Sequence, residues 1–244
     1  MTVISTDQSS GNLLYWVADN VIADDFPPVD SALRDPDGLL AIGGDLSIPR
    51  LLDAYKRGIF PWYSEGQPIL WWSPNPRCVI ELDNFRVSRS LRKKLKSGKY
   101  RVTFNRAFSE VMRKCSEPRS GHEGTWITRE IASAYIGLHS LKYAISVETW
   151  HDEVLCGGLY GVVIGRVFFG ESMFSRESDA SKIAMARLVE ILNQNHFRII
   201  DCQVYSRHLQ SLGATPMERG KFTNILKHYC YENIIYKWPE EAVI

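Results

Sequence analysis

The sequence has few cysteines and no long apolar run, and both absences restrict what the chain can be. Its five cysteines are odd in number and scattered, without a C-x-x-C pair. This pattern argues against a disulfide framework or a zinc site and favours a reducing compartment. No segment approaches 18 apolar residues, and no basic stretch followed by an apolar run opens the chain. We therefore expect a cytoplasmic protein with no membrane span.

The usual motifs of covalent and metal catalysis are also missing. The chain contains no G-x-S-x-G, no H-E-x-x-H and no P-loop sequence, and its six histidines lack metal-ligand spacing. We predict no metal and no cofactor. Any reaction must then depend on polar groups that the fold itself positions.

The order of the expected elements indicates a mixed α+β fold. The chain has 244 residues, of which 45% are hydrophobic and 23% charged, so a substantial core can form. Prolines 74 and 76 suggest a boundary between a small N-terminal domain (1–76) and a larger domain (77–244). The first twenty or so residues are polar and irregular, which predicts a loosely ordered arm. A hairpin around Gly165 and a helix over 181–193 precede an apolar strand over 197–205.

That last strand carries two polar residues in its middle. Asp201 and Gln203 are two positions apart, so in a regular strand they project from the same face. A carboxylate in an apolar strand is costly unless it is hydrogen-bonded or used in chemistry. The segment alone leaves both interpretations open, a satisfied buried carboxylate or a reacting pair. Cys202 lies between them, and we expect it to be a buried structural thiol on the opposite face.

Two neighbouring segments could complete a site near this strand. Glu171 follows a glycine where the chain leaves a strand, and backbone can approach a ligand closely there. An exposed turn acid is the alternative. Met185, Leu188 and Leu192 share one helix face, which is usually core. Because that helix directly precedes the strand, the same face could form the floor of an apolar pocket.

Basic residues are concentrated in one part of the chain. Between Arg86 and Arg119 there are twelve lysines and arginines and only two acidic residues, although the whole chain has a net charge of +1. Such a cluster is typical of a polyanion-binding surface, with a solvated helix face as the alternative. Aromatic residues are missing from its densest part, which favours phosphate contact over base stacking. The candidate phosphate-binding residues are Arg89, Arg92, Lys93, Lys94 and Lys96.

Eight short motifs occur together and in order along the chain. They are Gly43-Gly-Asp-Leu46, Arg57-Gly-Ile-Phe-Pro-Trp62, Trp71-Trp-Ser-Pro74, Gly124-Thr-Trp-Ile-Thr128, Gly157-Gly-Leu-Tyr-Gly161, Gly170-Glu-Ser-Met-Phe-Ser175, Ile200-Asp-Cys-Gln-Val204 and Ser211-Leu-Gly-Ala214. Together they resemble the bacterial leucyl/phenylalanyl-tRNA–protein transferase family, over about residues 26–222. Each motif is weak alone, but the ordered set is very specific.

The resemblance implies a fold and an activity. The C-terminal domain would have an acetyltransferase-like (GNAT) fold. The enzyme would move Leu or Phe from Leu-tRNA or Phe-tRNA to the N-terminal Arg or Lys of a protein, marking it for degradation. We expect it to act as a monomer without membrane contact.

The resemblance also assigns roles to individual residues. The family's catalytic pair falls on Asp201 and Gln203, and its active-site acid on Glu171. Its platform for the terminal adenosine falls on Trp62 and Trp126, with Tyr55 nearby. Its amino-acid side-chain pocket falls on Leu159, Phe168, Met173, Met185, Leu188, Leu192 and Ile200.

Two other functions are compatible with parts of the pattern. An acyl-CoA-dependent N-acetyltransferase on the same fold needs a pyrophosphate-binding loop before a helix. The nearest match, Gln210-Ser-Leu-Gly-Ala-Thr215, lies after the Asp201 strand instead. A non-catalytic RNA-binding module would explain the basic cluster and the tryptophans, but it leaves Asp201 and Gln203 without a role.

Overall fold

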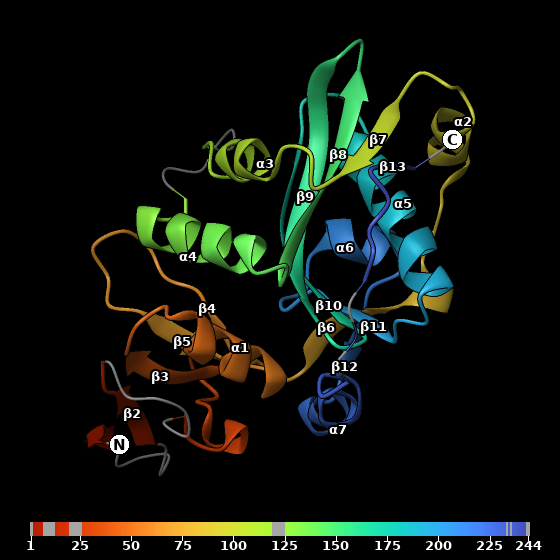
Figure 1. The fold of residues 1–244 in the computed structure, drawn as a ribbon. Helices are drawn as coiled ribbons and strands as arrows, with labels where there is room; N and C mark the ends of the chain where they lie inside the picture. Colours follow the sequence, from red (N-terminus) through yellow and green to blue (C-terminus); the bar gives the residue numbers. More distant parts are fainter. Residues whose placement is uncertain are drawn as a thin grey trace.

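The computed structural model describes residues 2–6, 13–19, 26–118, 125–232, 234 and 236–242. These residues form two β-sheets with helices packed around them (Figure 1). The predicted basic residue Arg119 and the motif residue Gly124 lie outside the described residues. None of the described helices is both long and apolar enough to cross a membrane.

The first sheet belongs to the N-terminal part of the chain and runs in the order β1-β2-β3-β5-β4. Its strands are β1 (Thr2–Thr6), β2 (Leu13–Val17), β3 (Leu39–Gly43), β4 (Phe60–Pro61) and β5 (Leu70–Trp72). Helix α1 (Ile48–Lys56) connects β3 to β4. Pro49 lies in its first turn, and Gly58, at φ +79°, turns the chain away after its end.

The second sheet runs in the order β12-β6-β11-β10-β9-β8-β7-β13. Its strands are β6 (Arg77–Glu81), β7 (Arg101–Phe104), β8 (Ala144–His151), β9 (Val154–Ile164), β10 (Val167–Ser175), β11 (Ile199–Asp201), β12 (Thr215–Met217) and β13 (Glu241–Ala242). β10 and β11 pair in parallel, and the other neighbours in this sheet pair antiparallel. A parallel pair needs a crossover connection, which the helix α5 between them provides.

The helices cover both faces of the second sheet (Figure 1). The helices that follow α1 are α2 (Arg89–Leu95), α3 (Phe108–Cys115), α4 (Arg129–Ser140), α5 (Ala180–Gln194), α6 (Arg207–Ser211) and α7 (Arg219–Tyr229). Two short 3₁₀ helices lie elsewhere in the chain, at Val29–Ser31 and Leu82–Asn84. α3 and α4 pack on one face and α5 on the other. The apolar side chains divide accordingly into two buried clusters, one on each face.

The cluster on the α4 face extends into the N-terminal part of the molecule. It joins Leu51 and Tyr55 of α1 and Trp71 of β5 to Tyr135 of α4 and Phe169 of β10. The two sheets themselves divide between Trp72 and Arg77. The division into domains at residue 76 stays a prediction, and the shared cluster shows that the two parts pack closely together.

Three sequence-based expectations need correction. The N-terminal arm is not irregular where it is described, because residues 2–6 and 13–17 form β1 and β2. The strand expected over 197–205 is only Ile199–Asp201. The strand expected to end at Gly170 continues to Ser175, so Glu171 lies within β10 and not in an exposed turn.

The two parallel strands separate where the polar residues begin. β10 pairs with β11 only through Val167–Phe169, opposite Ile199–Asp201. Beyond that point β10 continues beside β9 to Ser175, while the chain after Asp201 turns away. Ligands in open α/β sheets often bind beyond the carboxyl ends of parallel strands. A ligand-binding site is therefore expected where β10 separates from β11.

Candidate functional site

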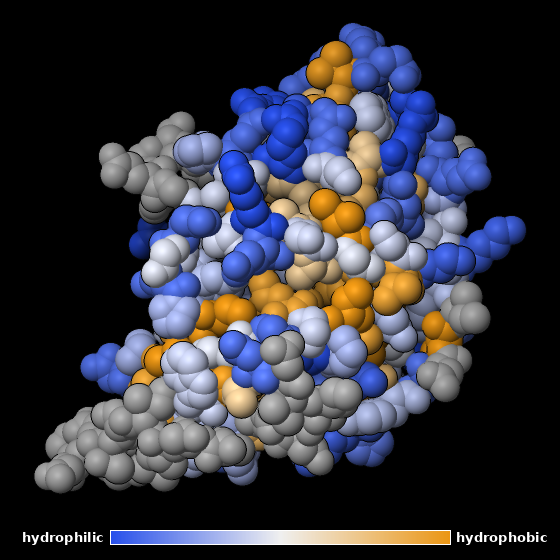
Figure 2. All heavy atoms as spheres, turned by 60° about the vertical axis from the view of Figure 1, so that its left-hand side comes forward, coloured by the Kyte–Doolittle hydropathy of each residue, from blue (hydrophilic) through white to orange (hydrophobic). Residues whose placement is uncertain are grey.

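A cavity of about 370 Å³ lies at the separation of β10 and β11. Its wall includes Glu171, Ser172 and Gln203 as polar groups among mainly apolar side chains. Figure 2 shows the face that carries α3 and α4, where apolar side chains gather in a hollow at the centre beneath a hydrophilic rim. A small, mostly apolar cavity with a few polar groups is the usual form of a binding site.

Most of the predicted side-chain pocket lines this cavity. Five of the seven residues form part of its wall: Leu159, Phe168, Met173, Met185 and Ile200. The other two, Leu188 and Leu192, are fully buried in the core cluster on the α5 face and belong to the packing of that face. The helical spacing of Met185, Leu188 and Leu192 therefore contributes one residue to the cavity and two to the core.

Asp201 is fully buried and bound to a buried arginine. Its two carboxylate oxygens accept from Nε and Nη2 of Arg77, at 2.8 and 2.7 Å. Arg77 also donates to the carbonyl oxygen of Gly58 at 3.1 Å, and its guanidinium lies over the rings of Phe60 and Phe222. The carboxylate is thus neutralised in place, which corresponds to the satisfied-carboxylate interpretation of the sequence.

Asp201 also holds the turn that carries Gln203. The backbone N–H of Gln203 donates to Asp201 Oδ1 at 3.0 Å, and Gln203 has a φ of +54°. The carbonyl oxygen of Cys78 accepts from the backbone N–H of Cys202, and the backbone N–H of Cys78 donates to the carbonyl oxygen of Gln203. Two residues after β11 therefore face one residue of β6. Asp201 and Gln203 therefore do not project from one regular strand face. The turn directs the Gln203 side chain toward Glu171.

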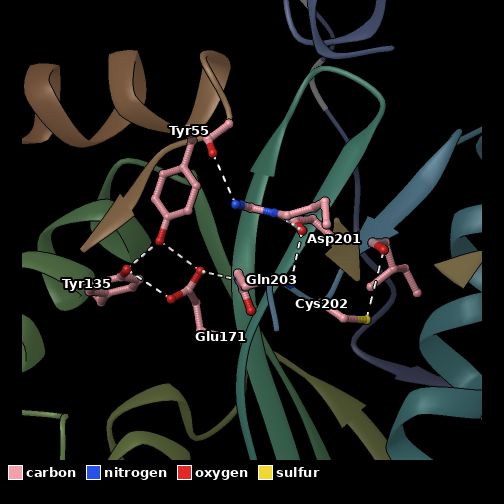
Figure 3. Close-up of polar contacts among 9 residues, drawn as sticks. Tyr55, Tyr135, Glu171, Asp201, Cys202 and Gln203 are labelled. Atoms are coloured by element: carbon pink, nitrogen blue, oxygen red, sulfur yellow. Dashed lines mark hydrogen bonds and ion pairs between the residues drawn. The ribbon is translucent and has the colours of Figure 1, made fainter. Parts of the chain in front are cut away.

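Glu171 is surrounded by tyrosine hydroxyls from two helices (Figure 3). The Tyr55 hydroxyl of α1 is hydrogen-bonded to its Oε1 at 2.7 Å, and the Tyr135 hydroxyl of α4 is hydrogen-bonded to its Oε2 at 3.0 Å. The two tyrosine hydroxyls are hydrogen-bonded to each other as well. The amide Nε2 of Gln203 lies 3.4 Å from Oε1. Burial raises the pKa of Glu171 to about 7, despite the opposing hydrogen bonds from both tyrosines.

A bulge in β10 sets the direction of Glu171. Gly170 pairs with Gly161 and Ser172 with Tyr160, which leaves Glu171 as an extra residue between two paired positions. The bulge places the carboxylate on the face of the sheet that α1 and α4 cover, where both tyrosines reach it. The site thus combines an apolar wall on the α5 side with a polar cluster on the α4 side.

Tyr160 is a further tyrosine at this site. It is fully buried, lines the cavity, and its ring packs edge-on against Tyr135 at 5.9 Å. Its hydroxyl has no hydrogen-bond partner among the described residues. A buried hydroxyl without a partner is unfavourable.

The three residues predicted to hold adenosine lie in different surroundings. Trp126 lines the cavity, whereas Trp62 is 44% exposed and packs against Trp72 with ring centres 5.8 Å apart. Tyr55 is fully buried and presents its hydroxyl to Glu171. The structure therefore brings Trp126 and Glu171 to one cavity and leaves Trp62 on the surface.

The five candidate phosphate-binding residues of the basic cluster lie on α2 or directly after its end. Arg89, Arg92, Lys93 and Lys96 are exposed, and Ser88 caps the helix by accepting the Leu91 N–H at 3.1 Å. Lys94 differs, because its Nζ is paired with Asp179 at 3.0 Å and bonded to the Ser178 carbonyl. Four of the five predicted phosphate-binding residues therefore face solvent, and the fifth attaches α2 to the start of α5.

Sequence reasoning missed Arg77, Tyr135 and Tyr160. Arg77 follows a Pro-rich turn and resembles a surface residue until β6 places it beside Asp201. Tyr135 is on the helix predicted after Thr128, and a buried tyrosine facing an acid could have been suspected only from a tertiary contact. Among the described residues, no group of three His, Cys, Asp or Glu side chains could hold a metal ion.

Comparison with known proteins gives a consistent result. The model of the leucyl/phenylalanyl-tRNA protein transferase family matches residues 79–227, and that of the family's N-terminal domain matches residues 44–75. The chain is 53% identical to the leucyl/phenylalanyl-tRNA–protein transferase of Stutzerimonas stutzeri, covering 88% of this chain and 94% of that one. It is 56% identical to the protein of the same name from Aromatoleum aromaticum, covering 85% and 88% of the two chains.

Likeness to solved structures is weaker. The C-terminal domain of a putative lysylphosphatidylglycerol synthetase from Agrobacterium fabrum aligns over 78% of this chain and 58% of that chain, with 11% identity and a TM-score of 0.37. A likeness of this size carries no argument about fold or function.

Proposed function

Because the chain belongs to the leucyl/phenylalanyl-tRNA–protein transferase family, we propose that its reaction takes place in the cavity between β10 and β11. The enzyme transfers an aminoacyl group from aminoacyl-tRNA to the N-terminus of a protein. The observation that carries the proposal is the composition of this cavity, where an apolar wall meets Glu171 and Gln203. The apolar wall suits a Leu or Phe side chain, and the polar groups suit the reacting amine and ester.

The proposed chemistry needs positioning and no covalent enzyme intermediate. An aminoacyl ester is already activated, so the acceptor amine has only to be held, deprotonated and directed at the ester carbonyl. With Nε2 of Gln203 directed at Glu171, the amide oxygen remains as an acceptor for the amine hydrogens. Asp201 is occupied by Arg77, so its role is to hold the Gln203 turn.

The same proposal includes the acceptor residues, the contacts with tRNA, the oligomeric state, the cellular compartment and the fold of the larger domain. We propose acceptors with N-terminal Arg or Lys, a terminal adenosine on Trp126 and Trp62, and phosphate contacts from the exposed face of α2. We further propose that the enzyme works as a monomer in the cytoplasm and that residues 77–244 have an acetyltransferase-like fold. The parallel pair β10–β11 with its crossover helix α5 supports the last point.

The start of α5 argues against acyl-CoA as the donor. A pyrophosphate bound at a helix N-terminus needs free backbone amides. Here the Ser181 N–H donates to Ser175 Oγ at 2.9 Å, and the Ala180 N–H donates to the Glu177 carbonyl at 3.1 Å. The carboxylate of Asp179 stands at the same place, paired with Lys94 and Lys182. The protein's own groups thus occupy this helix end.

A transfer assay tests the proposal. The chain is incubated with radiolabelled Leu-tRNA and a peptide that begins with Arg, beside a peptide that begins with Ala. We expect label on the Arg peptide only, and a loss of transfer in Gln203→Ala. Absence of transfer by the unaltered chain would contradict the proposed function. Full activity in Gln203→Ala would contradict the assignment of the reaction to this cavity.

A further inference from the structure

The contacts among Glu171, Tyr55 and Tyr135 close a triangle (Figure 3). Tyr55 contacts one carboxylate oxygen at 2.7 Å, Tyr135 contacts the other at 3.0 Å, and the two hydroxyl oxygens contact each other. Both tyrosines are fully buried, so water does not reach them to supply or accept hydrogens. The three contacts therefore have to be satisfied with hydrogens that the three side chains carry.

Counting those hydrogens favours a protonated carboxyl group in the triangle. Three hydrogen bonds need three hydrogens, each tyrosine has one, and an ionised carboxylate has none. If both tyrosines donate to an ionised Glu171, the contact between their own oxygens holds no hydrogen and brings lone pairs together. A protonated Glu171 supplies the third hydrogen. It donates to one tyrosine, that tyrosine donates to the other, and the second donates back to the free carboxyl oxygen.

Burial of Glu171 favours the same state and outweighs the charged groups nearby. Asp201 raises the pKa of Glu171, and the guanidinium of Arg77 lowers it. Arg77 is bound to Asp201 and to the Gly58 carbonyl, and no cation is paired with Glu171 in the described part of the chain. Gln203 approaches from the turn after β11 and Tyr160 from β9, both neutral. Cys115 of α3 contributes a thiol near Tyr160, and burial raises the pKa of all three tyrosines, which keeps them protonated.

We propose that Glu171 enters the transfer reaction as a neutral carboxylic acid and is the proton store of the site. The proposal rests on the proposed function of the cavity. In the reaction the acceptor nitrogen bonds to the ester carbonyl carbon, and the bond from that carbon to the ribose oxygen breaks. Glu171 gives its proton to the departing ribose oxygen. The triangle then takes the proton that the amine nitrogen loses, so the carboxyl group ends the cycle neutral.

A neutral Glu171 has a different role from a counter-ion. It cannot pair electrostatically with the cationic side chain of an N-terminal Arg or Lys. It can instead donate a hydrogen bond, and it regains its hydrogen from the amine nitrogen within the same reaction cycle. The tyrosines position the carboxyl group and keep its proton; they do not touch the substrates in this scheme.

Spectroscopy on the substrate-free protein tests the protonation state directly. Carboxyl ¹³C chemical shifts of glutamate-labelled protein are followed from pH 5 to pH 9, and Glu171→Gln identifies the signal. We expect that signal to be that of a neutral acid at pH 6 and to titrate near pH 7. The control is Glu177→Gln, because Glu177 also accepts from a tyrosine hydroxyl, Tyr100 at 2.9 Å. The hydrogen bond from His151 lowers the pKa of Glu177, so this variant should remove an ionised signal. An ionised Glu171 at pH 6 would overturn the proposal.

Kinetics provide a second, independent readout. Single-turnover transfer is measured against pH for the unaltered chain and for Glu171→Gln. Above the pKa of the acceptor amine, about 8, the rate should fall about tenfold per pH unit as Glu171 loses its proton. Glu171→Gln should be slower and lack this decline. A decline that persists in Glu171→Gln would contradict the proton-store role, while failure of the unaltered chain to transfer at all would instead contradict the proposed function.

Discussion

At the scale of single residues, Arg77 connects three separate parts of the chain through its buried guanidinium. It neutralises Asp201 on β11, donates to Gly58 after α1, and lies over Phe222 of α7. Both members of the Arg77–Asp201 pair are essentially unexposed. Removing one partner of a buried pair leaves an uncompensated charge, whereas removing both does not.

This difference gives a prediction for stability. Arg77→Met should lower the free energy of unfolding by about 3–5 kcal/mol, and adding Asp201→Asn should recover part of that loss. Denaturant unfolding of both variants measures the effect. The control is Arg101→Met, since the pair of Arg101 with the exposed Glu153 is worth less than about 1 kcal/mol. If Arg77→Met and the double variant lost the same free energy of unfolding, the uncompensated charge of Asp201 would not be the cause of the loss.

Glu171 leads to a prediction about pH. Its pKa is raised by burial from 4.5 to about 7 in the folded chain, so folding favours the protonated form. The associated stability is complete below about pH 4.5 and is lost as pH rises through 7. Glu171→Gln does not titrate, and it should therefore gain stability relative to the unaltered chain by up to about 3 kcal/mol between pH 5 and pH 8. Thermal unfolding at both pH values checks this, and a constant difference would contradict the raised pKa.

The hydroxyl of Tyr160 leads to a prediction about stability. Its hydroxyl is buried without a partner in the described part of the chain, so Tyr160→Phe removes a polar group that the folded state leaves unsatisfied. We expect the variant to be as stable as the unaltered chain or more stable by about 1 kcal/mol in denaturant unfolding. Tyr135→Phe is the control, because it removes a bonded hydroxyl and should destabilise. A loss of stability in Tyr160→Phe would reveal a bonded hydroxyl.

At the scale of elements, periodicity and turn residues predicted part of the fold. The hairpin at Gly165 is present as the β9–β10 turn, and the helix expected over 181–193 is present as α5. The predictions failed at β1, β2, β10 and β11. β2 pairs with β3 and β11 pairs with β6, both distant in the sequence, and β10 contains a bulge. Neither feature leaves a local signal in the residues concerned.

The exposed face of α2 is the element on which tRNA affinity should depend. Replacing Arg89, Arg92 and Lys93 together with Ala should weaken tRNA binding and reduce the slope of log affinity against log salt by roughly 2–3. Binding titrations at several salt concentrations measure the slope. Lys221→Ala with Lys227→Ala on α7 is the control, with little change expected. An unchanged slope in the α2 variant would place the phosphates elsewhere.

At the scale of the whole molecule, the sequence predicted which polar side chains lie together better than how they are arranged. Asp201, Gln203 and Glu171 do lie within one connected group. What the residues could not reveal was that Asp201 is occupied by Arg77, or that the tyrosine beside Glu171 comes from α4. Both facts depend on contacts between segments more than thirty residues apart, which only the fold brings together.

The shared core predicts that the larger part of the chain needs the smaller one. Residues 77–244 alone would expose Phe169 and Tyr135, which pack with Tyr55 and Leu51 in the same buried cluster. We expect this fragment to unfold without a cooperative transition and to bind a hydrophobic dye, in contrast to the full chain. A fragment with a sharp transition of its own would show that the two parts fold independently.

The link from Gly58 through Arg77 to Asp201 also has an evolutionary consequence. A substitution of Arg77 alone leaves the Asp201 carboxylate buried without a counter-ion, and a substitution of Asp201 alone does the same to the Arg77 guanidinium. Either single substitution should therefore be strongly destabilising. Related chains should therefore keep both residues or replace both together. Position 58 should tolerate only residues that reach φ +79°, and the three positions should be inherited as one unit.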